Sequence, residues 1–509
     1  MEDLDTMGED AGYLWLIRHL GLRVPEPRVQ HRIGVGSRRS VQSDGPITRR
    51  VLPAARAVAP EPGAQLLFAL KHDGVDLTVL AAVFKVIDTA VLARVIAEKP
   101  YSAGRRRLWF LYEWMTPEAP LPLEDLTNGA YVPVLDPNRY HTPAVGRDQR
   151  SRRHRVEVNL LGTRGFCPIV RRTDRLADYA GEEVDQQMRE LRDSFDEALF
   201  TRAVTYLYQK ESRSSFAIEQ ETATPDRNAR FVAELARAEQ DDYLNAERLV
   251  ALQNAIVEPR YQNTGWRETQ IYVSHTVNWT DQHFHYIGPK PEDVDALMRG
   301  LIDTGHRVLR PGAAVQPLVA AALVAFGFVF IHPFDDGNGR IHRLLIHHVL
   351  SRTGFTPPGM VLPVSAVMLE QMGRYDAALE AFSKPLLKHL DYTLDDAHQM
   401  TVSGDTADFY RYPDLTFQAE VLGEFIRQAV REELPRELRF LETYDRLREG
   451  VREVVDMPNV KLDLMLKLLR QGNGHLSKRK RQGQFAELED REVAAMERVY
   501  AEVMATSEP

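Results

Sequence analysis

One segment of the chain, residues 331–343, concentrates the side chains best suited to chemistry, and it reads IHPFDDGNGRIHR. His332 is its candidate general base, because an unperturbed imidazole titrates near neutral pH. Gly337-Asn338-Gly339 offers closely spaced backbone N–H groups with little steric cover. A glycine-rich loop that opens a helix is an anion site, because its unpaired N–H groups and the positive helix end face the ligand.

The charged side chains of this segment suit a polyphosphate that carries a metal ion. Arg340 and Arg343 are three residues apart, so they share one face of a first helical turn and can hold phosphate oxygens. Asp336 supplies the hard oxygen ligand that Mg²⁺ on a polyphosphate needs. Beside a base, these groups indicate phosphoryl or nucleotidyl transfer. The alternative is a core loop with a satisfied histidine and two surface arginines, which the concentration of suitable residues disfavours.

Two helices are expected to position the segment. The apolar run 318–331 is shorter than the roughly 18 residues that a membrane span needs, which favours a buried core helix. Pro333 cannot easily continue that helix, so His332 is expected on a loop at its end. Apolar residues at core spacing then predict a second helix: Ile341, Leu344, Leu345 and Val349.

Composition sets the broad class of the protein. The chain has 509 residues, of which 44% are apolar and 27% charged, and a formal net charge of −9. These values are typical of a soluble globular protein with about two to four domains, and the mild acidity argues against a surface that coats nucleic acid or membrane. The single cysteine, Cys167, excludes an internal disulfide and a Cys-rich zinc site. A cytoplasmic location without a signal peptide is expected.

The string HPFDDGNGRIHR resembles the signature of the Fic (Fido) family, HPFx(D/E)GNGRxxR, at every specified position. The resemblance runs from about Ser214 to Ala381 and implies a mainly α fold, with a helical Fic core and a β-hairpin flap. It implies an enzyme that transfers AMP from ATP to a Ser, Thr or Tyr hydroxyl of a protein target, with Mg²⁺ as cofactor. The enzyme itself is one expected target. Transfer of another nucleotide or of a phosphoryl group is the alternative, although the intact GNGR favours nucleotide transfer.

The resemblance also assigns a role to each position of the segment. Three residues would be catalytic: His332, Asn338 and Arg340. Among them, His332 would deprotonate the target hydroxyl. Asp336 is expected to bind ATP through Mg²⁺, and Gly337, Asn338 and Gly339 are expected to form an anion hole. Arg340 would contact the β-phosphate and Arg343 the γ-phosphate. Tyr375 is expected near the adenosine, because Arg374-Tyr375 followed by Leu379 resembles the family's Tyr-Tyr-x-x-Leu stretch. Asp376 stands where the second Tyr is expected.

Two patterns at 265–287 predict the flap. Gly265-Trp266-Arg267 resembles the family's Gly-aromatic-Arg segment, and the alternating strings ETQIYVS and QHFHYIG around Asn278–Asp281 predict a β-hairpin. In such enzymes the flap aligns the target chain by strand addition. The expected docking residues are Thr269, Ile271, Tyr272 and Val273. The plainer interpretation is an ordinary surface hairpin.

Residues 214–220, SSFAIEQ, resemble the family's inhibitory helix motif, (S/T)xxxE(G/N). Ser215 and Glu219 are four residues apart and share one helical face. The resemblance implies that Glu219 pairs with Arg343 and keeps it from the γ-phosphate. Gln220 departs from the motif, which places the local helix end in question. An ordinary exposed glutamate is the plainer interpretation, and in some family members the same residue supports removal of AMP.

The chain is expected to comprise five regions: a flexible arm (1–63), a helical module with a candidate helix-turn-helix (64–175), an inhibitory-helix region (176–258), the Fic core (259–395) and a C-terminal helical region (396–509). If the second region bound DNA or a partner protein, the chain would instead be a regulator with a nucleotide-sensing Fic core. A small helical bundle is the simpler interpretation. Homo-oligomerisation is one expected means of controlling Glu219. The histidines of the flap and of 342–348 are interpreted as structural rather than zinc ligands.

Overall fold

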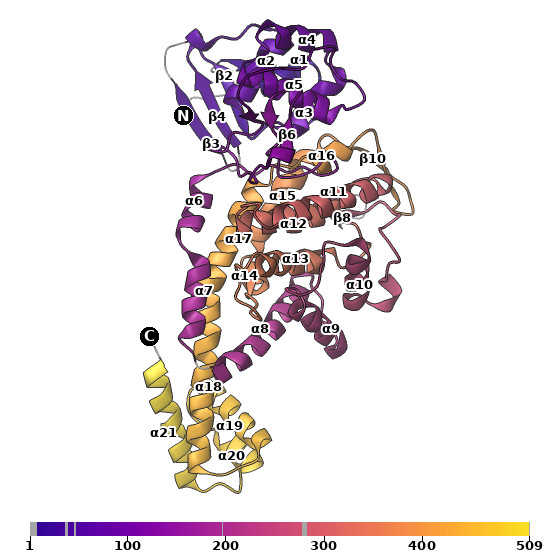
Figure 1. The fold of residues 1–509 in the computed structure, drawn as a ribbon. Helices are drawn as coiled ribbons and strands as arrows, with labels where there is room; N and C mark the ends of the chain where they lie inside the picture. Colours follow the sequence, from indigo (N-terminus) through magenta and orange to yellow (C-terminus); the bar gives the residue numbers. More distant parts are fainter. Residues whose placement is uncertain (1–7, 36–38, 45–46, 196, 277–281, 508–509) are drawn as a thin grey trace.

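Within the described residues, three large hydrophobic cores divide the protein, beside a small cluster of Ala11, Leu52 and Phe68. The computed structural model describes residues 8–35, 39–44, 47–195, 197–276 and 282–507. The first core gathers buried residues between Tyr13 and Ile169, together with Tyr412. The second, which is the largest, runs from Leu161 to Leu438, and the third from Leu447 to Tyr500. In Figure 1 the N-terminal part lies at the top, the largest helical body in the middle and the C-terminal helices at the bottom.

The first 63 residues were expected to be a flexible arm, and the structure corrects this for the part it describes. Helix α1 (Tyr13–His19) accompanies a four-stranded sheet of order β1-β2-β4-β3. Its strands are β1 (Glu9–Ala11), β2 (Val29–Ile33), β3 (Ser40–Asp44) and β4 (Ile47–Leu52). Strands β2 and β4 pair in parallel, and the other two pairs are antiparallel. The strands are short and rich in Arg, Gln and Ser, so their sequence lacks the alternation of apolar and polar residues that would predict a strand. Pairing between distant segments stabilises them instead.

Four helices follow, as the sequence predicts: α2 (Pro62–His72), α3 (Leu77–Val86), α4 (Thr89–Glu98) and α5 (Ala103–Met115). Asp76 and Asp88 cap α3 and α4 by accepting from the N–H groups of Val79 and Ala90. Short strands β5 (Val132–Pro133), β6 (Arg150–Ser151) and β7 (Val156–Glu157) form a small sheet. Arg153, in the basic cluster 147–155, pairs with Glu113 and Asp125. The helix-turn-helix remains a prediction.

Five helices cover the inhibitory-helix region: α6 (Asp174–Gly181), α7 (Val184–Asp193), α8 (Glu197–Ile218), α9 (Pro225–Ala236) and α10 (Ala246–Ile256). The pattern over 180–207 predicts one long helix, but the chain breaks it at Glu183, whose φ of 47° is left-handed. A left-handed residue cannot continue an α-helix. Helices α6 and α7 are therefore separate, and α8 begins anew at Glu197.

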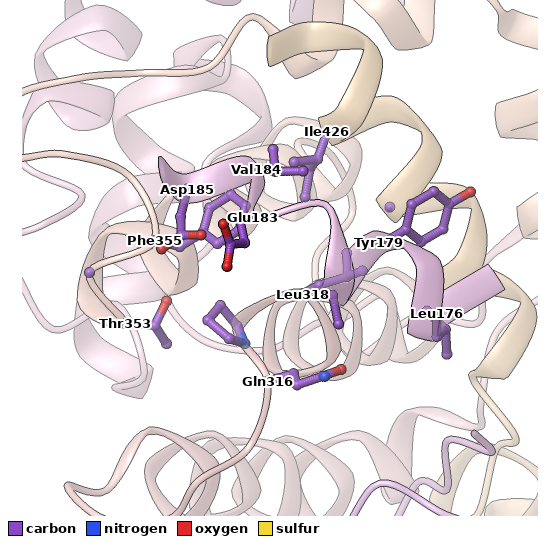
Figure 2. A pocket seen from close by; sticks show the side chains of 14 residues that line it. Leu176, Tyr179, Glu183, Val184, Asp185, Gln316, Leu318, Thr353, Phe355 and Ile426 are labelled. Carbon is purple, nitrogen blue, oxygen red and sulfur yellow. The ribbon is translucent and has the colours of Figure 1, made fainter. Parts of the chain in front are cut away.

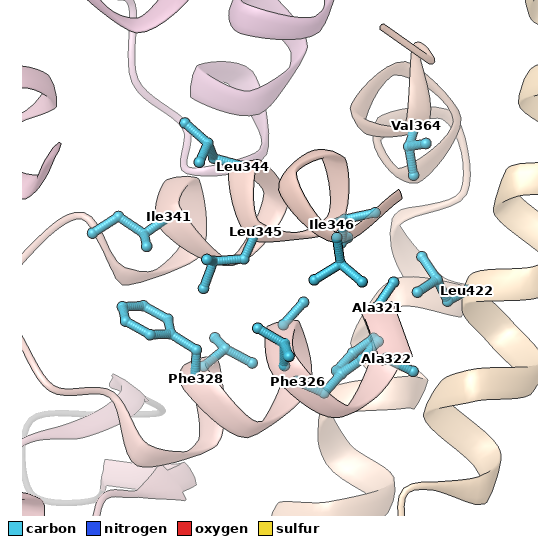
Figure 3. Close-up of a cluster of buried hydrophobic side chains, with 14 of the residues drawn as sticks. Ala321, Ala322, Phe326, Phe328, Ile341, Leu344, Leu345, Ile346, Val364 and Leu422 are labelled. Carbon is cyan, nitrogen blue, oxygen red and sulfur yellow. The ribbon is translucent and has the colours of Figure 1, made fainter. Parts of the chain in front are cut away.

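The site is held between two buried helices, α12 (Pro317–Ile331) and α13 (Asn338–Arg352). Every residue of 319–331 is buried, which confirms the core-helix interpretation of the apolar run. Phe326 and Phe328 of α12 belong to the same cluster of buried side chains as Ile341 and Leu345 of α13, and the two helices pack together there (Figure 3). The surrounding elements are a 3₁₀ turn (Pro259–Tyr261), β8 (Tyr272–Thr276), β9 (Gln282–Ile287), α11 (Pro291–Leu309), α14 (Val364–Glu370) and α15 (Met372–Leu387).

The C-terminal region begins with a hairpin and continues with helices: β10 (Asp391–Leu394), β11 (Met400–Ser403), α16 (Ala407–Arg411), α17 (Thr416–Gln428), a π-helical segment (Ala429–Glu433), α18 (Leu434–Val454), α19 (Asn459–Gln471), α20 (Lys478–Gln484) and α21 (Asp490–Ser507). Helix α17 packs on α12 and belongs to the largest core. The expected boundary at 395/396 therefore does not separate two cores. Among the described helices, none is long and apolar enough to cross a membrane.

Candidate active site

A six-residue loop, 332–337, turns the chain from α12 into α13. Both of its ends are left-handed, with φ of 52° at His332 and 91° at Gly337. The side chain of Asn338 binds both backbone groups of Phe334: Oδ1 accepts from its N–H at 3.1 Å, and Nδ2 donates to its C=O at 2.8 Å. Phe334 is itself fully buried. Asn338, expected to be catalytic, therefore uses its side chain to fix the shape of the loop.

The imidazole of His332 is held as a neutral base. Its Nδ1 donates to the C=O of Val329 at 3.1 Å, which leaves Nε2 as the acceptor. Burial lowers the pKa of His332 to about 4, so the ring is uncharged at neutral pH. Arg267, of the Gly-aromatic-Arg segment, donates to the C=O groups of His332 and Pro333. The flap segment thus fixes the backbone that carries the base.

The N-terminus of α13 carries a network of opposite charges. Oδ1 of Asp336 accepts from the N–H of Gly337 at 2.6 Å and from Nη2 of Arg340 at 2.7 Å. Nη1 of Arg340 donates to Glu221 at 3.0 Å, and its guanidinium lies 5.1 Å from the ring centre of Phe216. Sequence analysis missed Glu221, because a loop residue beyond a helix end carries no periodic signal. The expected phosphate ligand Arg340 is therefore engaged by two carboxylates.

The structure brings Ser215, Glu219 and Arg343 together. Nε of Arg343 donates to Oγ of Ser215 at 2.8 Å, and Nη2 donates to Oε1 of Glu219 at 2.8 Å. A Cβ atom added to Gly339 would collide with the Glu219 carboxylate, so this carboxylate covers the glycine of the anion-hole loop. Burial alone would raise the pKa of Glu219, but Arg343 and Arg340 outweigh it and hold the pKa below its usual value. Glu219 is accordingly ionised at neutral pH.

Helix α8 ends where the motif departs from the family pattern. Gln220 adopts φ of 57°, and the N–H of Glu221 donates to the C=O of Phe216 at 3.1 Å. This six-residue closure with a left-handed residue is a Schellman motif, in which Gly or Asn is preferred. Gln220 adopts the conformation that the motif requires, and Glu219 stays on the face of Ser215.

A cavity of about 310 Å³ lies beside His332. Its walls come from the flap, α12 and α15, and its lining residues are Val273, His285, Tyr286, Val329, Phe330, His332, Asp376, Leu379, Glu380 and Ser383. The predicted hairpin is confirmed by the antiparallel pairing of β8 and β9. The predicted turn at Asn278–Asp281 lies outside the described residues. Leu379 and Asp376, which follow Tyr375 on α15, line this cavity.

Tyr375, expected near the adenosine, is 3% exposed and does not line the cavity, and its ring centre lies 6.0 Å from that of His342. Burial raises its pKa to about 12, and Arg343 is the charged group that acts on it most strongly. The four expected docking residues are divided: Tyr272 and Val273 are in β8, whereas Thr269 and Ile271 precede it. Thr269 donates to Oδ1 of Asp335 at 2.8 Å.

A second cavity, of about 240 Å³, contains none of the predicted site residues. Its lining is mostly apolar and comes from α6, α7, α17 and the chain around the start of α12 and the end of α13 (Figure 2). Tyr179, Val184, Leu318 and Ile426 are among the residues that line it. The cavity beside His332, and not this second cavity, is therefore the one that adjoins the predicted site residues.

Comparison with known proteins shows what this site is similar to. Residues 243–350 match the family model described as Fic/DOC family. A protein adenylyltransferase Fic from Nematostella vectensis is 36% identical over 92 residues, 18% of this chain and 19% of that protein. A Fido domain-containing protein from Dictyostelium discoideum is 41% identical over 76 residues, 15% of this chain and 50% of that protein.

Further relatives match the same restricted part. A protein adenylyltransferase from Caenorhabditis elegans is 32% identical over 98 residues, 19% of this chain and 16% of that protein. Each of these matches thus spans at most half the length of the relative. Among solved structures, a Fic family protein from Desulfovibrio desulfuricans aligns with a TM-score of 0.37 at 19% identity, covering 55% of this chain and 80% of that one.

Proposed function

We propose that this protein is a protein adenylyltransferase, which transfers AMP from ATP to a Ser, Thr or Tyr hydroxyl of a protein. The observation that carries the proposal is the placement of a neutral base, His332, between a cavity and the glycine-rich start of α13. The named adenylyltransferases that match the Fic domain support the same activity. The nucleoside would enter the cavity, and the phosphates would lie on the N–H groups at the helix start.

The reaction requires a deprotonated hydroxyl beside the α-phosphorus of ATP. Nε2 of His332 is the free acceptor that can take the hydroxyl proton. The hydroxyl oxygen forms a bond to the α-phosphorus as the bond to the bridging oxygen breaks, and pyrophosphate leaves. Arg340 and Arg343 can offset the charge on the departing phosphates once their carboxylate partners give way.

Asp336 is the residue that would hold Mg²⁺. No group of three or more ligating side chains gathers around an ion position within the described residues. Mg²⁺ on a nucleotide commonly uses one or two carboxylates together with phosphate oxygens and water. The Asp336 side chain, 32% exposed at the helix start, fits that requirement. When bound, the ion would neutralise charge between phosphates.

We also propose that Glu219 inhibits the enzyme. Its carboxylate occupies Arg343 and covers Gly339, two groups that the phosphates of ATP would need. An added negative charge at that position also repels a polyphosphate. Displacing the α-phosphate by about 1 Å can slow transfer a hundredfold.

The decisive experiment is intact-protein mass spectrometry of Glu219→Gly after incubation with ATP and Mg²⁺. The expected product is the protein with added AMP, and Glu219→Gly/His332→Ala is the matched control that stays unmodified. A phosphate adduct would instead indicate kinase chemistry. Absence of any adduct on the variant or on an added mixture of proteins would contradict the proposal. Competition among ATP, GTP, CTP and UTP then identifies the nucleotide.

A further inference from the structure

Two polar stripes face each other between α8 and α13. Glu211 and Ser215 of α8 and Glu219, one residue beyond the end of α8, follow at intervals of four residues, and on α13 the partners are His347 and Arg343. The first contact joins Glu211 to His347, and the next joins Ser215 to Arg343. Higher residue numbers on α8 contact lower residue numbers on α13, so the two helices run antiparallel. Residues four apart share a face, and the inhibitory contact is therefore the last of a regular series.

The Glu211–His347 contact is fully buried. Oε1 of Glu211 lies 2.7 Å from Nε2 of His347, which donates to it. The N–H of Ser365 donates to Oε2 at 2.9 Å, and the Ser365 hydroxyl donates to Oε1. Glu211 is 1% exposed and His347 3% exposed. One side chain of α8 thus ties this helix to both α13 and α14.

A buried polar contact fixes helix register more strictly than apolar contacts do. Leu207 and Phe216 are the buried apolar residues near Glu211 on α8. Their contacts can accept a small sliding movement of the helix at modest cost in free energy. A slip of one residue would turn Glu211 by about 100° and leave its carboxylate buried without His347. Loss of one partner of a buried pair is strongly unfavourable. The register that satisfies Glu211 is also the register that brings Glu219 to Arg343.

We propose that Glu211 and His347 are positioning residues of the inhibitory helix. The proposal rests on the inhibitory role of Glu219 proposed above and extends it. Glu211 is eight residues from Glu219, about 12 Å along the helix axis, and neither it nor His347 lines the cavity beside His332. Breaking this pair loosens α8, moves Glu219 away from Arg343 and so raises nucleotide transfer.

The test compares two adjacent histidines of α13. His347→Leu removes the donor to Glu211. His348→Leu is the matched control, because His348 is equally buried but binds the C=O of Ala238, at 2.7 Å, instead of α8. Initial rates of self-labelling from tagged ATP are measured in the full-length chain, with thermal unfolding of each variant. His347→Leu is expected to label about three- to thirtyfold faster than wild type, and His348→Leu at the wild-type rate.

A second variant and a double variant keep the outcome decisive. Glu211→Gln keeps the volume of the side chain and is expected to raise labelling as well. In the Glu219→Gly background, His347→Leu should add no further increase, since the inhibitory carboxylate is already absent. If folded His347→Leu or Glu211→Gln labels itself at the wild-type rate while Glu219→Gly labels faster, the positioning role is overturned and the proposed function is not. Absence of labelling in Glu219→Gly overturns the proposed function instead.

Discussion

Arg343 donates through Nη2 to Oε1 of Glu219 at 2.8 Å, in the second turn of a helix whose start is covered by the same carboxylate. Arg343 is 1% exposed, so it cannot turn to solvent for another partner. A γ-phosphate would compete with Glu219 for one guanidinium. In the proposed inhibition, Glu219 and the γ-phosphate would therefore compete for the same guanidinium, and removal of the Glu219 side chain is expected to relieve it.

The first prediction concerns that removal. Glu219→Gly is expected to raise self-labelling from tagged ATP about ten- to a hundredfold, because the phosphates gain Arg343 and proper alignment. Glu219→Gln, which keeps the size but loses the charge, should give a smaller rise. His332→Ala in the Glu219→Gly background should reduce labelling to the level of heat-denatured protein. Equal labelling of wild type and Glu219→Gly would contradict the inhibitory role.

The second prediction is the pH dependence of the activated enzyme. Burial lowers the pKa of His332 to about 4, and a lowered pKa keeps the base form present at all pH values above it. The labelling rate of Glu219→Gly should therefore show no loss from protonation of His332 between about pH 8 and about pH 6. A fall centred near pH 6.5 would mean that His332 titrates as an exposed imidazole does.

The sequence predicts the site better than it predicts the architecture around it. His332, Asp336 and Arg343 lie within one short segment, and a proline and a glycine-rich loop define the local backbone. The pairing of Glu219 with Arg343 was also expected, from the resemblance to the family's inhibitory helix motif. Glu221 was missed because it follows the helix end. The role of Tyr375 stays a prediction, because its burial depends on tertiary packing that the local sequence pattern does not contain.

The third prediction uses Gly339. A Cβ at this position would meet the Glu219 carboxylate and lie 3.3 Å from Nη1 of Arg343. Gly339→Ala in the Glu219→Gly background should lower labelling about tenfold or more, because a methyl group keeps phosphates from the helix N–H groups. Gly373→Ala is the control, since a Cβ there meets nothing within 4 Å. Equal rates for the two double variants would show that phosphates do not approach Gly339.

The fourth prediction concerns the metal ion. Asp336→Asn keeps an oxygen at the helix start but weakens both the ion ligand and the pair with Arg340. Labelling by Glu219→Gly should stop when EDTA is added and return with excess MgCl₂, whereas Asp336→Asn should need more Mg²⁺ for half-maximal rate. Undiminished labelling in EDTA, after prior removal of metal by dialysis, would exclude this role for Asp336.

The last prediction addresses the departure at Gln220. Its φ of 57° costs a residue with a Cβ about 1 kcal/mol that glycine does not pay. Gln220→Gly should therefore raise the free energy of unfolding by about 0.5–1 kcal/mol, while leaving labelling at the inhibited level because α8 keeps its end. Gln220→Val, whose branched side chain tolerates this conformation poorly, should destabilise the protein and raise labelling. Chemical denaturation and labelling of the same preparations test both. Destabilisation by Gln220→Gly would mean that the glutamine side chain, rather than the left-handed backbone, secures the end of the inhibitory helix.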